Sequence, residues 1–139
     1  MDDRYDRYRP LAQVHFAVLD VETTGLSAVY GHRICEVACL RLCDGREIGR
    51  FESLVDPGRA ISAGAYRVNQ ISAALLAGAP VFGEVAPALL ALMDGAVLVA
   101  HNAPFDLSFL ASELDMANCP PPEGPVVDTL TLARRTYSF

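Results

Sequence analysis

Two acidic residues interrupt an apolar run near the start of the chain, Val18-Leu19-Asp20-Val21-Glu22-Thr23-Thr24-Gly25-Leu26. The residues from Phe16 to Leu19 favour β structure and are apolar on both alternating faces, which predicts a central strand covered on both sides of its sheet. Side chains alternate along a strand, so Asp20 and Glu22 point to one face with their Cα atoms about 6.5 to 7 Å apart. The sequence therefore predicts that two acids share one site.

Two neighbouring carboxylates at the end of a buried strand need a partner. Burying them costs several kcal/mol, and like charges this close raise each other's pKa. A hard divalent cation such as Mg²⁺ compensates them, and the turn at Thr23 to Gly25 brings hydroxyl and backbone groups close to whatever the metal holds. The alternative for an isolated Asp-x-Glu is a strand end whose acids cap a turn or pair with an arginine.

Length and composition limit the classes of protein that this chain can belong to. Its 139 residues, 52 % of them hydrophobic, suffice for one domain with its own core. The net charge of −6 argues against binding nucleic acid through a broad basic surface. The sequence has neither an apolar run long enough to span a membrane nor a signal peptide, so a cytoplasmic location is expected. Residues 1–12 are predicted to be a disordered arm, and residues 13–139 the domain.

After the first strand, the pattern predicts a β-hairpin and then helices. Two alternating segments, Ile34 to Cys43 and Arg46 to Val55, flank Asp44-Gly45, a strong hairpin signal. A short helix is expected around Ser72 to Ala77, with Ser72 as its N-cap. A second helical pattern opens at Pro80 and stops at Asp94-Gly95, and Pro87 either kinks this helix or marks its first turn near Glu84.

A second acidic motif follows the next predicted strand, Ala96 to Ala100, in the run His101-Asn102-Ala103-Pro104-Phe105-Asp106. Pro104 fits the first turn of a helix, which places Asp106 in that turn. This position faces the crevice at the carboxyl ends of parallel strands, where Asp20 and Glu22 also lie. Several acids that converge suit two metal ions about 3.5 to 4 Å apart, whereas Asp106 alone could simply complement the helix dipole. A last strand at Val126-Val127 and a helix from Asp128 or Thr129 through Ala133 complete the pattern.

These two motifs, together with the segment from Val127 to Arg135, resemble the DnaQ-like 3′-to-5′ exonucleases. This DEDD superfamily, in its DEDDh branch, includes the proofreading ε subunit of bacterial DNA polymerase III. The resemblance runs from about Phe16 to the end of the chain. It implies an α/β, RNase H-like fold, in which a mixed five-stranded sheet has three antiparallel first strands, later strands parallel to the first, and flanking helices.

The resemblance also implies the chemistry of the site. Two Mg²⁺ or Mn²⁺ ions would be held by the catalytic residues Asp20, Glu22 and Asp106, and an activated water would attack the terminal phosphodiester. The residues implied to bind the substrate are Thr23, Thr24, Gly25, Leu26, His101, Asn102 and Phe105. The expected substrate is the 3′ end of single-stranded DNA in proofreading or repair. The expected partner is a DNA polymerase or another replication or repair protein.

Two departures from the family pattern shape the remaining expectations. Asn69 and Gln70 stand where the family commonly has a histidine followed by a glycine. The third motif, a histidine about five residues before a fourth aspartate, is expected beyond Phe139, so we expect a C-terminally truncated domain with weak, millimolar metal binding and little turnover. Its missing helix would leave an apolar face that favours dimerisation. The alternatives are a non-catalytic module that binds nucleic-acid ends or a protein, and an exoribonuclease of the RNase T or oligoribonuclease type.

Overall fold

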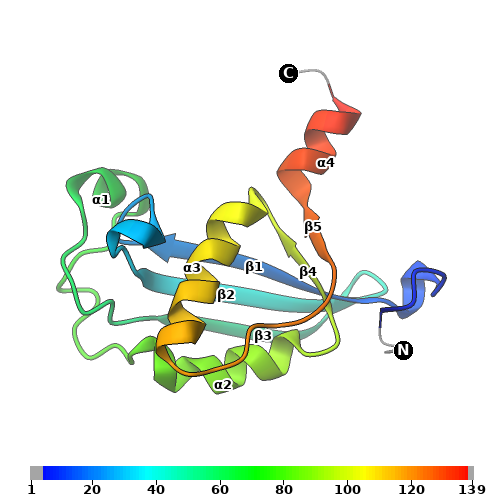
Figure 1. Ribbon diagram of the computed structural model, residues 1–139, viewed down its shortest axis with the longest axis horizontal. Coiled ribbons are helices and arrows are strands. Elements are labelled where there is room, and N and C mark those ends of the chain that lie inside the picture. Colours follow the sequence, from blue (N-terminus) through cyan, green and yellow to red (C-terminus); the bar gives the residue numbers. More distant parts are fainter. Residues whose placement is uncertain (1–4, 138–139) are drawn as a thin grey trace.

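The computed structural model describes residues 5–137, and its strands form one mixed sheet in the order β3-β2-β1-β4-β5 (Figure 1). The central strand β1 is antiparallel to β2 and parallel to β4, which in turn is parallel to β5. The strands span His15–Thr23 (β1), Ile34–Cys43 (β2), Arg46–Leu54 (β3), Val97–Ala100 (β4) and Val126–Asp128 (β5). This topology confirms the predicted mixed sheet of three antiparallel strands followed by two strands parallel to the first.

The hairpin between β2 and β3 forms where the sequence predicts it. Asp44 and Gly45 have φ angles of 52° and 72°, and a two-residue hairpin turn of type I′ requires positive φ at both central positions. The flanking residues Cys43 and Arg46 are paired across the two strands. The local turn chemistry therefore sets the register of this hairpin.

Two helices, α2 (Phe82–Met93) and α3 (Ala103–Met116), pack on the same face of the sheet (Figure 1). The core between them and the sheet consists of buried apolar side chains, including Ala17, Leu19, Val21, Phe82, Leu89, Met93, Phe109, Leu110 and Leu114. Pro87 lies inside α2, five residues after its first residue, so it does not mark the first turn of this helix. Both helices thus turn an apolar face to the sheet and supply much of the core.

The opposite face of the sheet is less covered. Phe16 and Val18 of β1 point to this face and are half-buried. Their neighbours across the sheet are also half-buried apolar residues, Leu40, Leu42, Val97 and Val99. The expectation that β1 is covered on both faces is therefore wrong for the described residues, because α2 and α3 both pack on the side of Leu19.

The short helix expected at Ser72 to Ala77 is placed wrongly. Residues 73–78 form turns, with Ser72 Oγ accepting the N–H of Leu75 at 3.2 Å. The helix of this region is α1 (Ala63–Asn69), whose N-cap Ser62 accepts the N–H of Ala65 at 3.1 Å. Helix propensity is a weak signal, and Gly64 lowers it further in the segment that does become helical.

The two ends of the described chain lie on the outside of the sheet. Tyr5 donates its hydroxyl hydrogen to the carbonyl of Glu123 at 2.8 Å, and a 3₁₀ turn, η2 (Leu11–Gln13), leads into β1. The disordered arm and the domain boundary at residue 13 stay predictions, and residues 1–4 lie outside the described part.

The last helix, α4 (Thr129–Thr136), extends away from the sheet (Figure 1). Within residues 5–137 no helix is long and apolar enough to cross a membrane.

Candidate active site

The end of β1 is left open on one side by the lengths of its neighbouring strands. β4 pairs only with Phe16, Ala17 and Val18 of β1, so the backbone from Asp20 onward has no β4 partner. On the other side a β-bulge interrupts the pairing with β2 between Glu22 and Thr23, and bulges of this kind change the direction of the strand and of its side chains. The acidic end of β1 is therefore accessible from the edge that faces β4.

The first turn of α3 occupies this opening and brings in Asp106. Asn102, the N-cap, adopts a left-handed conformation with φ of 62°, and Pro104 follows in the first turn. The Asp106 side chain is only 4 % exposed, and its Oδ2 has no hydrogen-bond partner among the described residues. A buried polar atom without a partner is costly, so this oxygen is free to bind a cation.

Electrostatic coupling links Asp106 to the two acids of β1. Burial raises the pKa of Asp106 to about 7, the charges of Asp20 and Glu22 add to the rise, and a hydrogen bond from the Val21 backbone offsets part of it. Burial also raises the pKa of Glu22, followed by the charges of Asp20 and Glu36. The acids of the two motifs are therefore close enough to interact electrostatically, and their convergence on a metal site stays a prediction.

The carboxylates are coupled but do not form a closed ligand set. Among the described residues, no three His, Cys, Asp or Glu side chains come close enough together to enclose a metal ion. Carboxylate oxygens are the hard donors that Mg²⁺ and Mn²⁺ prefer, and the unpartnered oxygen of Asp106 is a suitable ligand for either ion. The chemistry of these acids thus fits a divalent cation.

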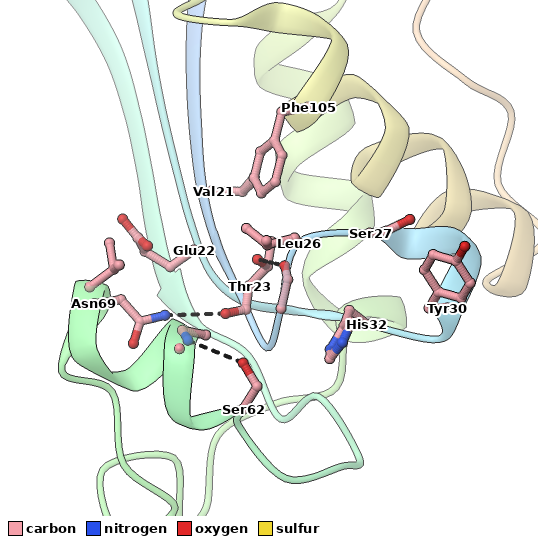
Figure 2. A pocket seen from close by; sticks show the side chains of 14 residues that line it. Val21, Glu22, Thr23, Leu26, Ser27, Tyr30, His32, Ser62, Asn69 and Phe105 are labelled. Atoms are coloured by element: carbon pink, nitrogen blue, oxygen red, sulfur yellow. Dashed lines mark hydrogen bonds between the residues drawn. The ribbon is translucent and has the colours of Figure 1, made fainter.

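A pocket of about 600 Å³ adjoins the end of β1. Figure 2 shows Phe105 of α3, Val21 of β1 and Leu26 of the following loop on its walls. Of the predicted site residues, the structure places Glu22, Thr23, Gly25, Leu26 and Phe105 in this lining. The Leu26 side chain is 88 % exposed, so an apolar group is available to contact a ligand.

α1 supplies one wall of the pocket, which the sequence motifs do not predict. The lining residues that were not expected as substrate contacts are Val21, Ser27, Tyr30, His32, Ser62, Gly64, Ala65, Val68 and Asn69. Two hydrogen bonds fasten α1 to the end of β1 and the residue that follows it. The Ser62 N–H donates to the Thr24 carbonyl at 2.9 Å. Asn69 Nδ2 donates to the Thr23 carbonyl at 3.1 Å, and Figure 2 draws this bond as a dashed line. Ser62, a good N-cap residue, was the available signal for this helix.

Thr24 and Gly25 have structural roles that the motif alone did not predict. Thr24 is fully buried and does not line the pocket; its Oγ1 accepts the N–H of Arg33 at 3.0 Å and lies 2.9 Å from Nδ1 of His32. A side chain at Gly25 would overlap the imidazole of His32. The turn after Glu22 is therefore held by its packing against His32 and Arg33.

His101 and Asn102 lie outside the pocket lining, at the junction between β4 and α3. His101 Nδ1 is 3.0 Å from Thr129 Oγ1, and the Asn102 N–H donates to Asp128 Oδ1 at 2.9 Å. Although burial opposes it, hydrogen bonds from nearby backbone N–H groups and from a threonine hydroxyl lower the pKa of Asp128. These contacts join the start of α3 to the start of α4 and so fix the turn that carries Asp106.

Comparison with known proteins agrees with this geometry. The family model described as exonuclease matches residues 17–139. A DNA polymerase III subunit epsilon-like protein from Rhodobacter capsulatus is 41 % identical over 126 residues, which cover 89 % of this chain and 18 % of that protein. A PolC-type DNA polymerase III from Halalkalibacterium halodurans is 40 % identical over 128 residues, which cover 92 % of this chain and 9 % of that protein.

Solved structures show the same architecture. Exonuclease X in complex with a 5′-overhanging duplex DNA matches with a TM-score of 0.68 at 30 % identity, covering 88 % of this chain and 64 % of that one. Apo exonuclease I matches with a TM-score of 0.80 at 18 % identity, covering 90 % and 31 %, a likeness of fold. The chain spans less than a fifth of the length of the two curated relatives. Since the family model matches nearly the whole of it, the chain belongs to the exonuclease family.

Proposed function

We propose that this chain carries the catalytic acids of a metal-dependent 3′-to-5′ exonuclease that hydrolyses the terminal phosphodiester of DNA. In this proposal Asp20, Glu22 and Asp106 hold the divalent cations. The observation that supports it best is the buried, unpartnered Oδ2 of Asp106, which is coupled to the acids of β1 beside a pocket of about 600 Å³. This volume suits one nucleotide, since small-molecule sites are typically about 300 to 1,000 Å³.

In this proposal the acidic side chains bind the cations, and the apolar side chains orient the substrate. Bound Mg²⁺ or Mn²⁺ would activate a water molecule and neutralise charge on the phosphate. Asp106, whose pKa burial raises to about 7, would lose its proton when it held a cation. Phe105 and the exposed Leu26 offer apolar surface to the terminal base, which holds the scissile bond at the acids.

The names of the relatives support a DNA substrate. The exonuclease X neighbour is in complex with duplex DNA, and the curated relatives are named as DNA polymerase III proteins. We therefore propose a DNA 3′ end as substrate and a replicative or repair polymerase as partner. An RNA substrate is the competing outcome, and matched DNA and RNA oligonucleotides separate the two because only RNA carries the 2′-hydroxyl.

The test is release of 3′-terminal nucleotides from single-stranded DNA labelled at its 5′ end, in Mg²⁺, by the protein made from the complete reading frame. Asp20→Ala is expected to lower the rate about 10³-fold, because it removes several kcal/mol of metal-dependent stabilisation. Asp115→Asn is the matched control, since Asp115 is an exposed acid on α3. If Asp20→Ala releases nucleotides at the wild-type rate, the assignment of the acids is wrong. Binding of DNA ends without any release would instead identify a non-catalytic module.

Self-association is a separate part of the proposal. The half-buried apolar face of the sheet around Phe16 and Val18 is the surface through which two copies would pair. Light scattering over a range of protein concentrations measures this directly. A dimer is expected to be lost in Val18→Lys, and a monomer at every concentration would refute the prediction.

A further inference from the structure

α3 carries a second buried acid besides Asp106. Glu113 follows Asp106 by seven residues, or two turns, so both side chains lie on the same stripe of the helix about 10.5 Å apart along its axis. The Glu113 side chain is only 2 % exposed. Two acids on one buried stripe are unusual, because carboxylates are rarely buried unless they are paired.

The two acids differ in their partners. Glu113 Oε1 accepts Arg33 Nε at 2.7 Å and the backbone N–H of Ile34 at 3.1 Å, while Oε2 accepts Arg33 Nη2 at 2.8 Å. Asp106 Oδ2, in contrast, has no partner within residues 5–137. Glu113 is therefore fully satisfied by protein groups, and it does not need a cation.

Arg33 connects this ion pair to the turn that follows Glu22. Its backbone N–H donates to Thr24 Oγ1 at 3.0 Å, and its carbonyl accepts the N–H of Thr24 at 2.9 Å. The same residue thus holds α3 through its side chain and the end of β1 through its backbone. Residues 80 positions apart in the sequence are joined at this point.

The remaining contacts of α3 with the sheet are mainly apolar, through Phe109, Leu110 and Leu114, beside the hydrogen bond from the Val21 backbone to Asp106 at the other end of the helix. Apolar packing is non-directional and by itself leaves a helix some freedom to slide or rotate. A bidentate arginine–carboxylate pair is directional and fixes the geometry of both partners. The pair is therefore the contact best suited to set the position of α3 along the strand.

We propose that Glu113 and Arg33 are positioning residues: their ion pair fixes α3 against the end of β1, and so sets the spacing between Asp106 and the acids Asp20 and Glu22. This inference rests on the proposed function, because it assigns the spacing a role in holding divalent cations. It predicts that loss of the pair weakens cation binding even where the fold keeps its stability.

The discriminating variant replaces both charges by apolar side chains, Arg33→Met with Glu113→Leu. Replacing a buried ion pair by apolar groups of similar size is often neutral for stability, so a merely structural pair would leave cation binding unchanged. We expect the Mn²⁺ dissociation constant of the 139-residue chain, measured by electron paramagnetic resonance, to rise about tenfold, as when groups that orient metal ligands are lost. The melting temperature is expected to fall by several degrees, because the buried N–H of Ile34 loses Glu113 Oε1 as its acceptor, so the change in dissociation constant is compared with that of a control of similar instability.

Two further variants serve as controls. Leu114→Ala removes a buried neighbour of Glu113, and is expected to lower the melting temperature while the Mn²⁺ dissociation constant stays within about twofold. Arg33→Lys keeps the charge but loses the bidentate fork, and is expected to raise the dissociation constant about threefold. If Arg33→Met with Glu113→Leu does not fold, the single substitution Arg33→Lys still tests the proposal.

The outcomes separate this inference from the proposed function. If Asp106→Asn weakens Mn²⁺ binding while the Arg33 and Glu113 variants leave it unchanged, only the positioning role is refuted. If every variant weakens binding in proportion to its loss of melting temperature, the pair is merely structural and the inference is refuted. If the wild-type chain does not bind Mn²⁺ at all, both the proposed function and this inference are refuted.

Discussion

Replacing Asp106 by asparagine is expected to stabilise the protein at neutral and alkaline pH in the absence of divalent cations. The pKa of Asp106 rises from 3.8 to about 7 on folding, chiefly through burial. Each pKa unit corresponds to about 1.36 kcal/mol, so a rise of about three units sets a ceiling of about 4 kcal/mol. Because Asp20, which adds to the rise, is exposed to solvent, the expected gain is about 1 to 3 kcal/mol.

The direction of the pH dependence follows from proton binding. Between about pH 4 and pH 7 the folded state retains a proton on Asp106 that the unfolded state has released, so the free energy of unfolding falls as the pH rises through this range. Below pH 4 both states are protonated and the penalty is absent. Glu22, whose pKa is also raised, contributes in the same direction.

The assay is urea unfolding of the wild type and Asp106→Asn from pH 4 to pH 8.5 with EDTA. The stability difference is expected to grow with pH in favour of the variant, while Asp115→Asn gives no such trend. Adding 10 mM Mg²⁺ at pH 8 should stabilise the wild type by about 1.4 kcal/mol for a millimolar dissociation constant, and leave Asp106→Asn unchanged. A stability difference that does not depend on pH, or a variant less stable than the wild type at pH 8, would refute the reasoning.

Three further substitutions test the end of α1 and the walls of the pocket. Gln70→Gly is expected to stabilise the protein by about 0.5 to 1 kcal/mol in thermal unfolding. Gln70 ends α1 with φ of 59°, a conformation that costs a non-glycine residue about 1 kcal/mol. Gln70→Ala keeps this strain and should therefore give no gain in stability. Gly25→Ala forces His32 to move and should lower the affinity for a 5′-labelled oligonucleotide about tenfold in fluorescence anisotropy, and unchanged affinity would contradict that packing. Phe105→Ala removes a wall of the pocket and should lower the same affinity about tenfold, whereas Leu75→Ala, at an exposed turn outside the lining, should not.

Local signals in the sequence were sufficient for most of the strands and for the two long helices. Asp44-Gly45 determines a hairpin by its own backbone preferences, and Pro104 is favoured in the first turn of a helix, so both predictions were correct. The position of α1 could not be predicted in the same way. Its short segment contains Gly64, and it is held by hydrogen bonds to the carbonyls of Thr23 and Thr24, some 40 residues earlier in the chain.

The sequence by itself determined which acids are functional candidates and on which elements they lie, because strand alternation and helix capping are local effects. Only the tertiary structure decided what surrounds each acid. Asp106 and Glu113 occupy equivalent positions on one buried stripe of α3, but Arg33 reaches Glu113, whereas Oδ2 of Asp106 has no partner among the described residues. This difference arises because β4 ends before the acidic end of β1 and leaves the edge of β1 open beside Asp106. The opening depends on how strands distant in the sequence pair, so it exists only in the folded chain.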